Sequence, residues 1–320
     1  MKRLFIIRTP LQLFNAIEAK NRFFDVSIKN ELLVVYGSEK DLVIIKKMLV
    51  EFNDWDRIIF QKFYGVGKRL YAFQLKKYFK INEYLDIFTG MIYHIPLHLM
   101  NTLSSKNYWL LDDGNETRLI VKNLNDGQYY KNDKSKFFLG INQNPSVLKQ
   151  LKIFTLYRNL ETNHQVCYND YRMFKQKVAS LEVHRNSCLI IGSNLVGTYL
   201  ENESCYLEIL ERLKFKEKDL ELWYAPHRYM PEETVKKIEQ MGYLIFKYDC
   251  ILEIAQMLQG WRFEKYFSIR STAIDTLNVL YGINGYYIRL PKKYFVSEDK
   301  WQECEAIWSA AEHLCDLTEL

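Results

Sequence analysis

Two adjacent aspartates, Asp112 and Asp113, close an apolar segment of the sequence and are candidates for acid–base chemistry. They follow residues 108–111 and precede Gly114, which places them where an extended strand would end. Two neighbouring carboxylates can supply a general base, because burial and the adjacent negative charge raise the pKa of one of them. An Asp-Gly pair is also typical of a tight turn, and taken alone that is its more frequent role.

His227 is the second candidate, since it follows the apolar segment 220–224 and lies between Pro226 and Arg228. A histidine at a strand end can protonate or hydrogen-bond a departing phosphate near neutral pH, and Arg228 favours an anion in the same place. The alternative is an ordinary loop histidine in solvent. The sequence alone leaves both roles open.

Ser271 and Thr272 form a third group, because they precede a helical pattern that starts at residue 273. Hydroxyl and free backbone N–H groups at a helix N-terminus bind anions, and the helix dipole and the neighbouring Arg270 strengthen such a site. Plain helix capping is the competing explanation. A weaker group of the same kind follows the strand at 187–191 and consists of Gly192, Ser193 and Asn194.

The histidines and cysteines form no metal motif, and the glycines form no cofactor motif. His94 and His98 are four residues apart, but Pro96 between them breaks the helix that a shared metal site would need. The six cysteines are scattered without a CxxC pair, so we expect reduced thiols in a cytoplasmic protein. The glycine-rich patterns of NAD and ATP sites are absent. We therefore expect neither a metal nor a cofactor.

The composition is typical of a globular enzyme and limits the partners. Of the 320 residues, 48% are hydrophobic and 26% are charged, and at about 150 residues per domain this length predicts two domains. The apolar runs are strand-sized, and Arg8 interrupts the first of them, so neither a membrane span nor a signal peptide is expected. A net charge of +5 is too small to indicate a nucleic-acid partner.

Strand and helix patterns alternate along both halves of the chain and place the candidate groups at strand ends. In the first half, strands are expected at 4–7, 32–36, 57–60, 87–89 and 108–111, with helices near 11–17, 41–52 and 68–80. A polar loop or hairpin at 121–142 and a helical connection near 171–180 come next. In the second half, strands are expected at 187–191, 220–224, 243–247, 263–267 and 286–289. The helices there are expected at 203–214, 234–241, 251–259, 273–280 and 301–314.

This alternation predicts an α/β protein of two Rossmann-like domains, 1–180 and 181–320, that face each other across a cleft. Ligands of such sheets bind beyond the carboxyl ends of the strands. A carboxylate would come from the first domain, and a histidine with an anion site from the second. That division suits the transfer of a group from a phosphate-activated donor to a hydroxyl. None of the candidate groups at the strand ends contains a DxD metal motif, so the expected donor is one that needs no divalent ion, such as a nucleoside monophosphate sugar.

The order of these groups resembles the motifs of bacterial lipooligosaccharide sialyltransferases (glycosyltransferase family 52) and the related capsular polysialyltransferases. That family carries an acidic-acidic-Gly triplet, a His-Pro pair after a strand, and a Ser-Ser or Ser-Thr pair that opens a helix. The corresponding residues here are Asp112-Asp113-Gly114, His227-Arg228 and Ser271-Thr272. The segment from Arg8 to Ala16 also resembles the family's first strand–turn–helix, so the likeness extends from residue 8 to about 280. Arg228 stands where the family usually has Pro, which leaves room for a different donor.

The resemblance implies a GT-B fold and an inverting, metal-independent transfer of sialic acid, or a related nonulosonic acid, from a CMP-sugar to a bacterial glycan or glycolipid. It implies that Asp112 takes the proton of the acceptor hydroxyl and that His227 protonates or stabilises the departing phosphate. Preferring Asp112 to Asp113 rests on the family pattern. The residues implied on the donor side are Arg270, Ser271, Thr272, Arg228, Gly192, Ser193 and Asn194, and those on the acceptor side are Thr9, Pro10, Gln12 and Asp113.

Other functions remain open at the level of sequence. The competing enzymes are GT-B transferases that use CMP-Kdo or a UDP-sugar, and the competing non-enzyme is a glycan-binding protein with the same cleft. The basic stretch from Lys68 to Lys80 is expected to be a solvated helix face, with peripheral contact to the inner membrane as the alternative. The last helix, which starts at Trp301, is available to pack across domains or in a homodimer.

Overall fold

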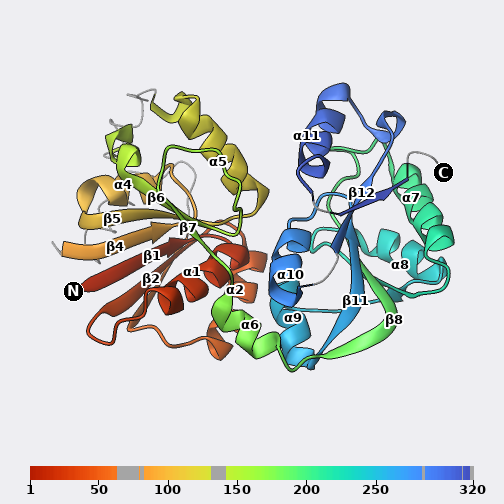
Figure 1. Ribbon diagram of the computed structural model, residues 1–320, viewed down its shortest axis with the longest axis horizontal. Helices are drawn as coiled ribbons and strands as arrows, with labels where there is room; N and C mark the ends of the chain where they lie inside the picture. Colours follow the sequence, from red (N-terminus) through yellow and green to blue (C-terminus); the bar gives the residue numbers. More distant parts are fainter. Residues whose placement is uncertain (63–78, 80–82, 131–141, 283–284, 312, 318–320) are drawn as a thin grey trace. The chain divides into compact units, whose positions relative to one another are not determined.

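Apolar runs become the buried strands of two parallel sheets in the computed structural model (Figure 1). The structure describes residues 1–62, 79, 83–130, 142–282, 285–311 and 313–317. The chain divides into two compact units, Met1–Phe174 and Lys175–Leu320. The basic residues of the stretch from Lys68 to Lys80 lie outside the described residues.

The first unit contains seven parallel strands within the described residues, in the order β3-β2-β1-β4-β5-β6-β7. The strands are β1 (Lys2–Ile7), β2 (Lys29–Tyr36), β3 (Arg57–Lys62), β4 (Glu83–Thr89), β5 (Ser104–Leu111), β6 (Leu151–Thr155) and β7 (Val166–Tyr168). The helices are α1 (Pro10–Arg22), α2 (Glu39–Glu51), α4 (Ile95–Thr102), α5 (Asn115–Asn125) and α6 (Arg172–Val178), the last of which continues into the second unit. This is the doubly wound order, in which the winding reverses between β1 and β4.

Local sequence explains where these elements begin and how they pack. Helix α1 begins after Thr9, whose Oγ1 accepts the Gln12 backbone N–H at 3.2 Å, with Pro10 at the first helical position. The β2 residues 32–35 are buried, as expected for a parallel sheet covered on both faces. Helix α5 continues to Asn125, so the loop expected from residue 121 starts later. Its buried side chains recur at a helical spacing: Thr117, Ile120, Val121 and Leu124.

The second unit has six parallel strands within its described part, in the order β10-β9-β8-β11-β12-β13. The strands are β8 (Glu182–Ile191), β9 (Glu221–Ala225), β10 (Leu244–Ile245), β11 (Trp261–Ser268), β12 (Gly285–Arg289) and β13 (Leu314–Asp316). The helices are α7 (Glu203–Lys216), α8 (Glu232–Gln240), α9 (Leu252–Gln259), α10 (Ala273–Tyr281) and α11 (Glu298–Trp308). The winding reverses between β8 and β11, so the predicted pair of Rossmann-like sheets is confirmed.

The end of the chain differs from the expectation of one long helix. Helix α11 ends at Trp308, which is fully buried, and the chain then forms strand β13. Strand β13 pairs with β12, with Cys315 opposite Ile288. Among the described residues, no helix has the length and apolar character needed to cross a membrane.

Candidate functional site

Asp113, just beyond the end of β5, is held by two residues at the start of α1. Thr9 Oγ1 donates to Asp113 Oδ1 at 3.1 Å, and Gln12 Nε2 donates to Asp113 Oδ2 at 2.7 Å. The Asp113 side chain is half-buried. Burial, together with the charges of Asp112 and Glu116, raises its pKa to about 6 in spite of these donors. An oriented carboxylate with this pKa is a general-base candidate.

The Gln12 side chain, which holds Asp113 by a hydrogen bond, is wholly buried. Its Oε1 accepts the Arg8 backbone N–H at 2.7 Å, which fixes the amide so that Nε2 points to Asp113. The same Nε2 donates to the Gly90 carbonyl at 3.2 Å. A Cβ at position 90 would lie 2.1 Å from the Gln12 Cδ, so this position requires glycine. Pro10, the other predicted acceptor-side residue, is buried in the first turn of α1.

Asp112 is enclosed by four hydrogen-bond donors. Its Oδ1 accepts the Gly114 backbone N–H and the Thr117 hydroxyl, both at 2.9 Å. Its Oδ2 accepts the Thr155 hydroxyl at 2.6 Å and the Leu156 backbone N–H at 2.9 Å. These contacts tie the turn after β5 to the end of β6.

The two aspartates therefore differ in what they can do. Asp112 is 0% exposed, both of its oxygens are occupied, and burial raises its pKa. Asp113 keeps part of its surface exposed and has one side-chain donor on each oxygen. A base must reach its substrate, so the geometry favours Asp113, whereas the family pattern favoured Asp112. The hydrogen bonds of Asp112 also fix the turn that presents Asp113.

Three side chains near Asp113 were absent from the predicted set, namely Arg8, Tyr93 and Glu116. Burial raises the pKa of Tyr93, and the charges of Glu116 and Asp113 add to this effect while Arg8 opposes it. The Arg8 guanidinium lies over Gly37, where a Cβ would be 3.0 Å from Nη2. Each of the three follows a strand of the first sheet within a few residues, which is the sequence signal that could have found them.

His227 follows β9 in the second unit and is half-buried. Its Nδ1 accepts the Tyr229 backbone N–H at 3.4 Å, so a neutral ring carries its proton on Nε2. Burial, and then the positive charge of Arg228, lowers its pKa. Near pH 7 the imidazole is therefore neutral, with an N–H to donate. Arg228 itself is exposed, and its guanidinium carbon lies 5.3 Å from the Tyr229 ring centroid.

Ser271 and Thr272 lie between β11 and α10, and both are half-buried. Ser271 Oγ accepts the Ala273 backbone N–H at 3.4 Å, and the Thr272 side chain makes no capping hydrogen bond. The guanidinium carbon of Arg270 lies 4.3 Å from the Tyr199 ring centroid. Within the described part of the chain, Arg270 Nε is buried without a hydrogen-bond partner. These groups suit an anion at the start of α10.

Gly192, Ser193 and Asn194 follow β8, which lies between β9 and β11 in the sheet. A Cβ on Gly192 would lie 2.5 Å from the Tyr224 hydroxyl, so packing explains this glycine. Ser193 Oγ is buried and has no hydrogen-bond partner among the residues described, and Asn194 is exposed. The three predicted groups of the second unit thus come from adjacent strand ends. In the described regions no three His, Cys, Asp or Glu side chains gather to hold a metal ion.

Comparisons with known proteins find a shared fold. No family model matches the sequence, and neither does any curated protein. The GT-B domain of a Photobacterium damselae sialyltransferase matches 99% of this chain over 100% of its own length, with a TM-score of 0.53 and 12% identity. A complex of Staphylococcus aureus MnaA with UDP has a TM-score of 0.53 and 11% identity, covering 97% of this chain and 87% of that one. The chain has the GT-B fold.

A third structure extends this likeness to another enzyme. The Neisseria meningitidis UDP-GlcNAc 2-epimerase bound to UDP-GlcNAc also has a TM-score of 0.53, at 9% identity, covering 96% of this chain and 85% of that one. At such identities the likeness concerns the fold alone, and the chemistry of this GT-B chain depends on its own residues.

Glu253, in the first turn of α9, is a buried carboxyl that was not among the predicted site residues. Burial raises its pKa to about 7. Glu253 lies close enough to Tyr248 for its charge to raise the pKa of that phenol, and the charge of Arg228 lowers the same pKa. The Tyr248 hydroxyl donates to the Pro226 carbonyl at 3.1 Å, beside His227. Glu253 is therefore a further polar group near the His227 loop.

We expect Glu253→Gln to stabilise the protein at alkaline pH. The folded carboxyl ionises near pH 7 and the unfolded one near 4.5, so the free energy of unfolding falls as pH rises between these values, by about 3 kcal/mol in all. The glutamine removes this loss. Thermal unfolding at pH 5 and pH 8 measures the resulting gain in stability over the wild type, with the exposed Glu239→Gln as control. Equal effects of both variants at pH 8 would contradict the raised pKa.

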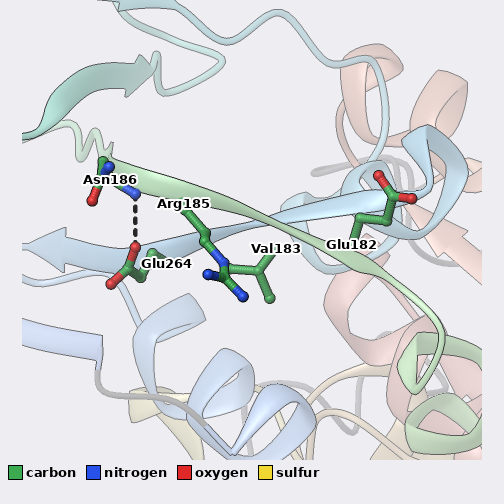
Figure 2. A pocket seen from close by; sticks show the side chains of 5 residues that line it. All are labelled: Glu182, Val183, Arg185, Asn186 and Glu264. Atoms are coloured by element: carbon green, nitrogen blue, oxygen red, sulfur yellow. Dashed lines mark hydrogen bonds between the residues drawn. The ribbon is translucent and has the colours of Figure 1, made fainter.

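An open hollow of 720 Å³ lies on β8 and β11 (Figure 2). Its lining residues are Glu182, Val183, Arg185, Asn186 and Glu264. The Asn186 backbone N–H donates to Glu264 Oε2 at 2.7 Å, the dashed line in Figure 2. Because the hollow lies along the first half of β8, it contains none of the predicted site residues, which follow the carboxyl ends of the strands.

Proposed function

We propose that this protein is an inverting glycosyltransferase that moves sialic acid, or a related nonulosonic acid, from a CMP-sugar to a hydroxyl of a bacterial surface glycan such as lipooligosaccharide or capsule. The observation that carries the proposal is Asp113, a half-buried carboxyl with a pKa of about 6 that Thr9 and Gln12 orient in a GT-B chain. The donor class is supported by the order of the three motifs. The sialyltransferase domain from P. damselae shares the fold.

In the proposed reaction the acceptor oxygen attacks the anomeric carbon while the bond from that carbon to the CMP phosphate oxygen breaks. Asp113 takes the proton of the acceptor hydroxyl, in place of the Asp112 that the resemblance implied. Gln12 and Thr9 hold each carboxylate oxygen in one direction, so a lone pair is oriented before the acceptor binds. A single displacement of this kind inverts the anomeric configuration.

The departing phosphate is proposed to bind at the strand ends of the second unit. His227 donates Nε2–H to it, because Nδ1 is occupied by the Tyr229 N–H. Thr272 and Ser271 add hydroxyl groups at the start of α10, and Arg270 adds a permanent positive charge. A guanidinium and a helix N-terminus stabilise a phosphate dianion without a divalent ion, so we propose a metal-independent transfer.

Calorimetric titration with CMP, UDP and CDP, each with and without EDTA, tests the donor class. We expect CMP to bind and EDTA to leave its affinity unchanged. The second candidate is a UDP-sugar enzyme, because S. aureus MnaA is bound to UDP and the N. meningitidis epimerase to UDP-GlcNAc in the same fold. Preference for UDP, or loss of binding in EDTA, would replace the first proposal by this second one.

We expect His227→Ala to lower kcat for CMP-sialic acid by about 100-fold, since one positioned proton or hydrogen-bond donor contributes this much. His227→Gln provides an N–H in a similar place and should recover part of the rate. Initial rates of CMP release measure both. A His227→Ala enzyme with unchanged kcat would show that His227 does not contact the departing phosphate.

A further inference from the structure

In the proposed donor site, Arg270 directly precedes Ser271 and Thr272. An arginine side chain is long and flexible, so it needs other contacts to hold its guanidinium toward a phosphate. Its guanidinium carbon lies 4.3 Å from the Tyr199 ring centroid, a distance typical of a stacked cation–π pair. Stacking on a ring removes rotamer freedom from the long side chain. Cys304 in α11 is a second side chain that interacts with Arg270. The orientation of Arg270 therefore depends on how firmly Tyr199 and α11 are held.

Tyr199 is fixed at its hydroxyl and at its backbone. The hydroxyl donates to Glu303 Oε2 at 2.7 Å, and the Tyr199 carbonyl accepts the Val296 backbone N–H at 2.9 Å. The Tyr199 N–H donates to the Leu195 carbonyl at 2.8 Å. Burial and the Glu303 contact raise the pKa of Tyr199 to about 12, which keeps the hydroxyl protonated as a donor.

Helix α11 completes the support. Lys300 Nζ donates to Glu303 Oε1 at 2.6 Å and lies 4.9 Å from the Tyr199 ring centroid. Trp308 Nε1 donates to the Ile269 carbonyl at 2.8 Å, which fixes the backbone directly before Arg270. Three segments, one after β8, one after β11 and one in α11, thus converge on a single guanidinium.

We infer that Tyr199 is a positioning residue that holds Arg270 for the phosphate of the donor nucleotide. This inference rests on the proposed function and extends it, because it makes a stacked arginine the fixed positive charge of the donor site. Lys300 is paired with Glu303, so Arg270 supplies the net charge of the cluster. One fixed positive charge, together with the N-terminus of α10, suits the phosphate of a monoester such as CMP.

Affinities for CMP and for cytidine, which lacks the phosphate, test the inference by calorimetry. We expect Arg270→Gln to weaken CMP binding about 30-fold, because it removes a charge-assisted hydrogen bond. We expect Tyr199→Leu to weaken CMP binding about 10-fold, because the guanidinium remains but is no longer oriented. Cytidine affinity should stay within about twofold in both. Tyr199→Phe keeps the ring and should recover most of the CMP affinity. In the Arg270→Gln background, Tyr199→Leu should have no further effect, since the two act through one guanidinium.

A matched control exists in the first unit, where the Arg158 guanidinium carbon also lies 4.3 Å from the Tyr168 ring centroid. Tyr168→Leu removes an equal stack and should leave CMP affinity unchanged. If the wild type binds no CMP, the proposed function fails. If the wild type binds CMP and Tyr199→Leu binds it equally well, or if Tyr199→Leu loses cytidine as strongly as CMP, the positioning inference alone is overturned.

Discussion

Replacing Asp113 by asparagine is expected to lower kcat about 1,000-fold, the middle of the range for loss of a general base, while CMP affinity stays unchanged and the fold is not destabilised. Asparagine has the same shape but cannot take the acceptor proton. Its carbonyl oxygen can face Gln12 Nε2, and its NH₂ can face the Thr9 hydroxyl, which can rotate to accept. The fold therefore tolerates this variant, and initial rates with CMP-sialic acid isolate the chemical defect.

The pH dependence gives this prediction a second measurement. The carboxyl is active when ionised, and its pKa is about 6, so kcat/KM should rise between pH 5 and 7 and level off above. Gln12→Leu removes a donor that favours the ionised form and should move the rise to higher pH. A rise that stays at pH 6 in Gln12→Leu, or a fully active Asp113→Asn enzyme, would contradict the assignment of the base to Asp113.

The alternation of strands and helices could be predicted from the sequence because burial on both faces of a parallel sheet demands continuous apolar runs. The runs at 4–7 and 32–36 are of this kind, and they lie within β1 and β2. Strand β7 has three residues and β13 has three, and both are defined by their partners more than by their own sequence. Such short edge strands carry little periodic signal.

The choice between Asp112 and Asp113 could not be made from the sequence for a related reason. Both precede the same glycine, and nothing in their neighbours separates them. The burial of Asp112 depends on Thr155 and Leu156, more than forty residues along the chain in β6 and just after it. The contact of Asp113 with Thr9 and Gln12 spans about a hundred residues. Only the folded sheet brings these partners together.

Glu253 shows the opposite case, in which the local sequence contains a signal. A glutamate within the apolar stretch 251–255 is unusual at a position that a helical pattern assigns to the core. Burial raises its pKa to about 7, which disfavours the charged form in the folded state. Glu253 lies inside α9 and not at a strand end, so the strand-end position that selected Asn194 could not select it.

Asp112→Asn is expected to destabilise the first unit, in contrast to the same change at Asp113. Each Asp112 oxygen accepts one backbone N–H, from Gly114 on one side and from Leu156 on the other. A backbone N–H cannot accept, so an amide in either orientation places its NH₂ against one of them. A buried donor left unpaired, with the loss of a buried charge network, costs about 3 kcal/mol.

This loss should lower the unfolding midpoint of the first unit by about 8 °C, because roughly 2–4 °C is lost per kcal/mol at this domain size. Hydrogen exchange should also speed up at the Gly114 and Leu156 amides, while Asp113→Asn leaves both unchanged. The two variants are matched in chemistry and differ by one position. If Asp112→Asn folds with wild-type stability and abolishes transfer while Asp113→Asn remains active, then Asp112 is the base, and its four donors must open when the acceptor binds.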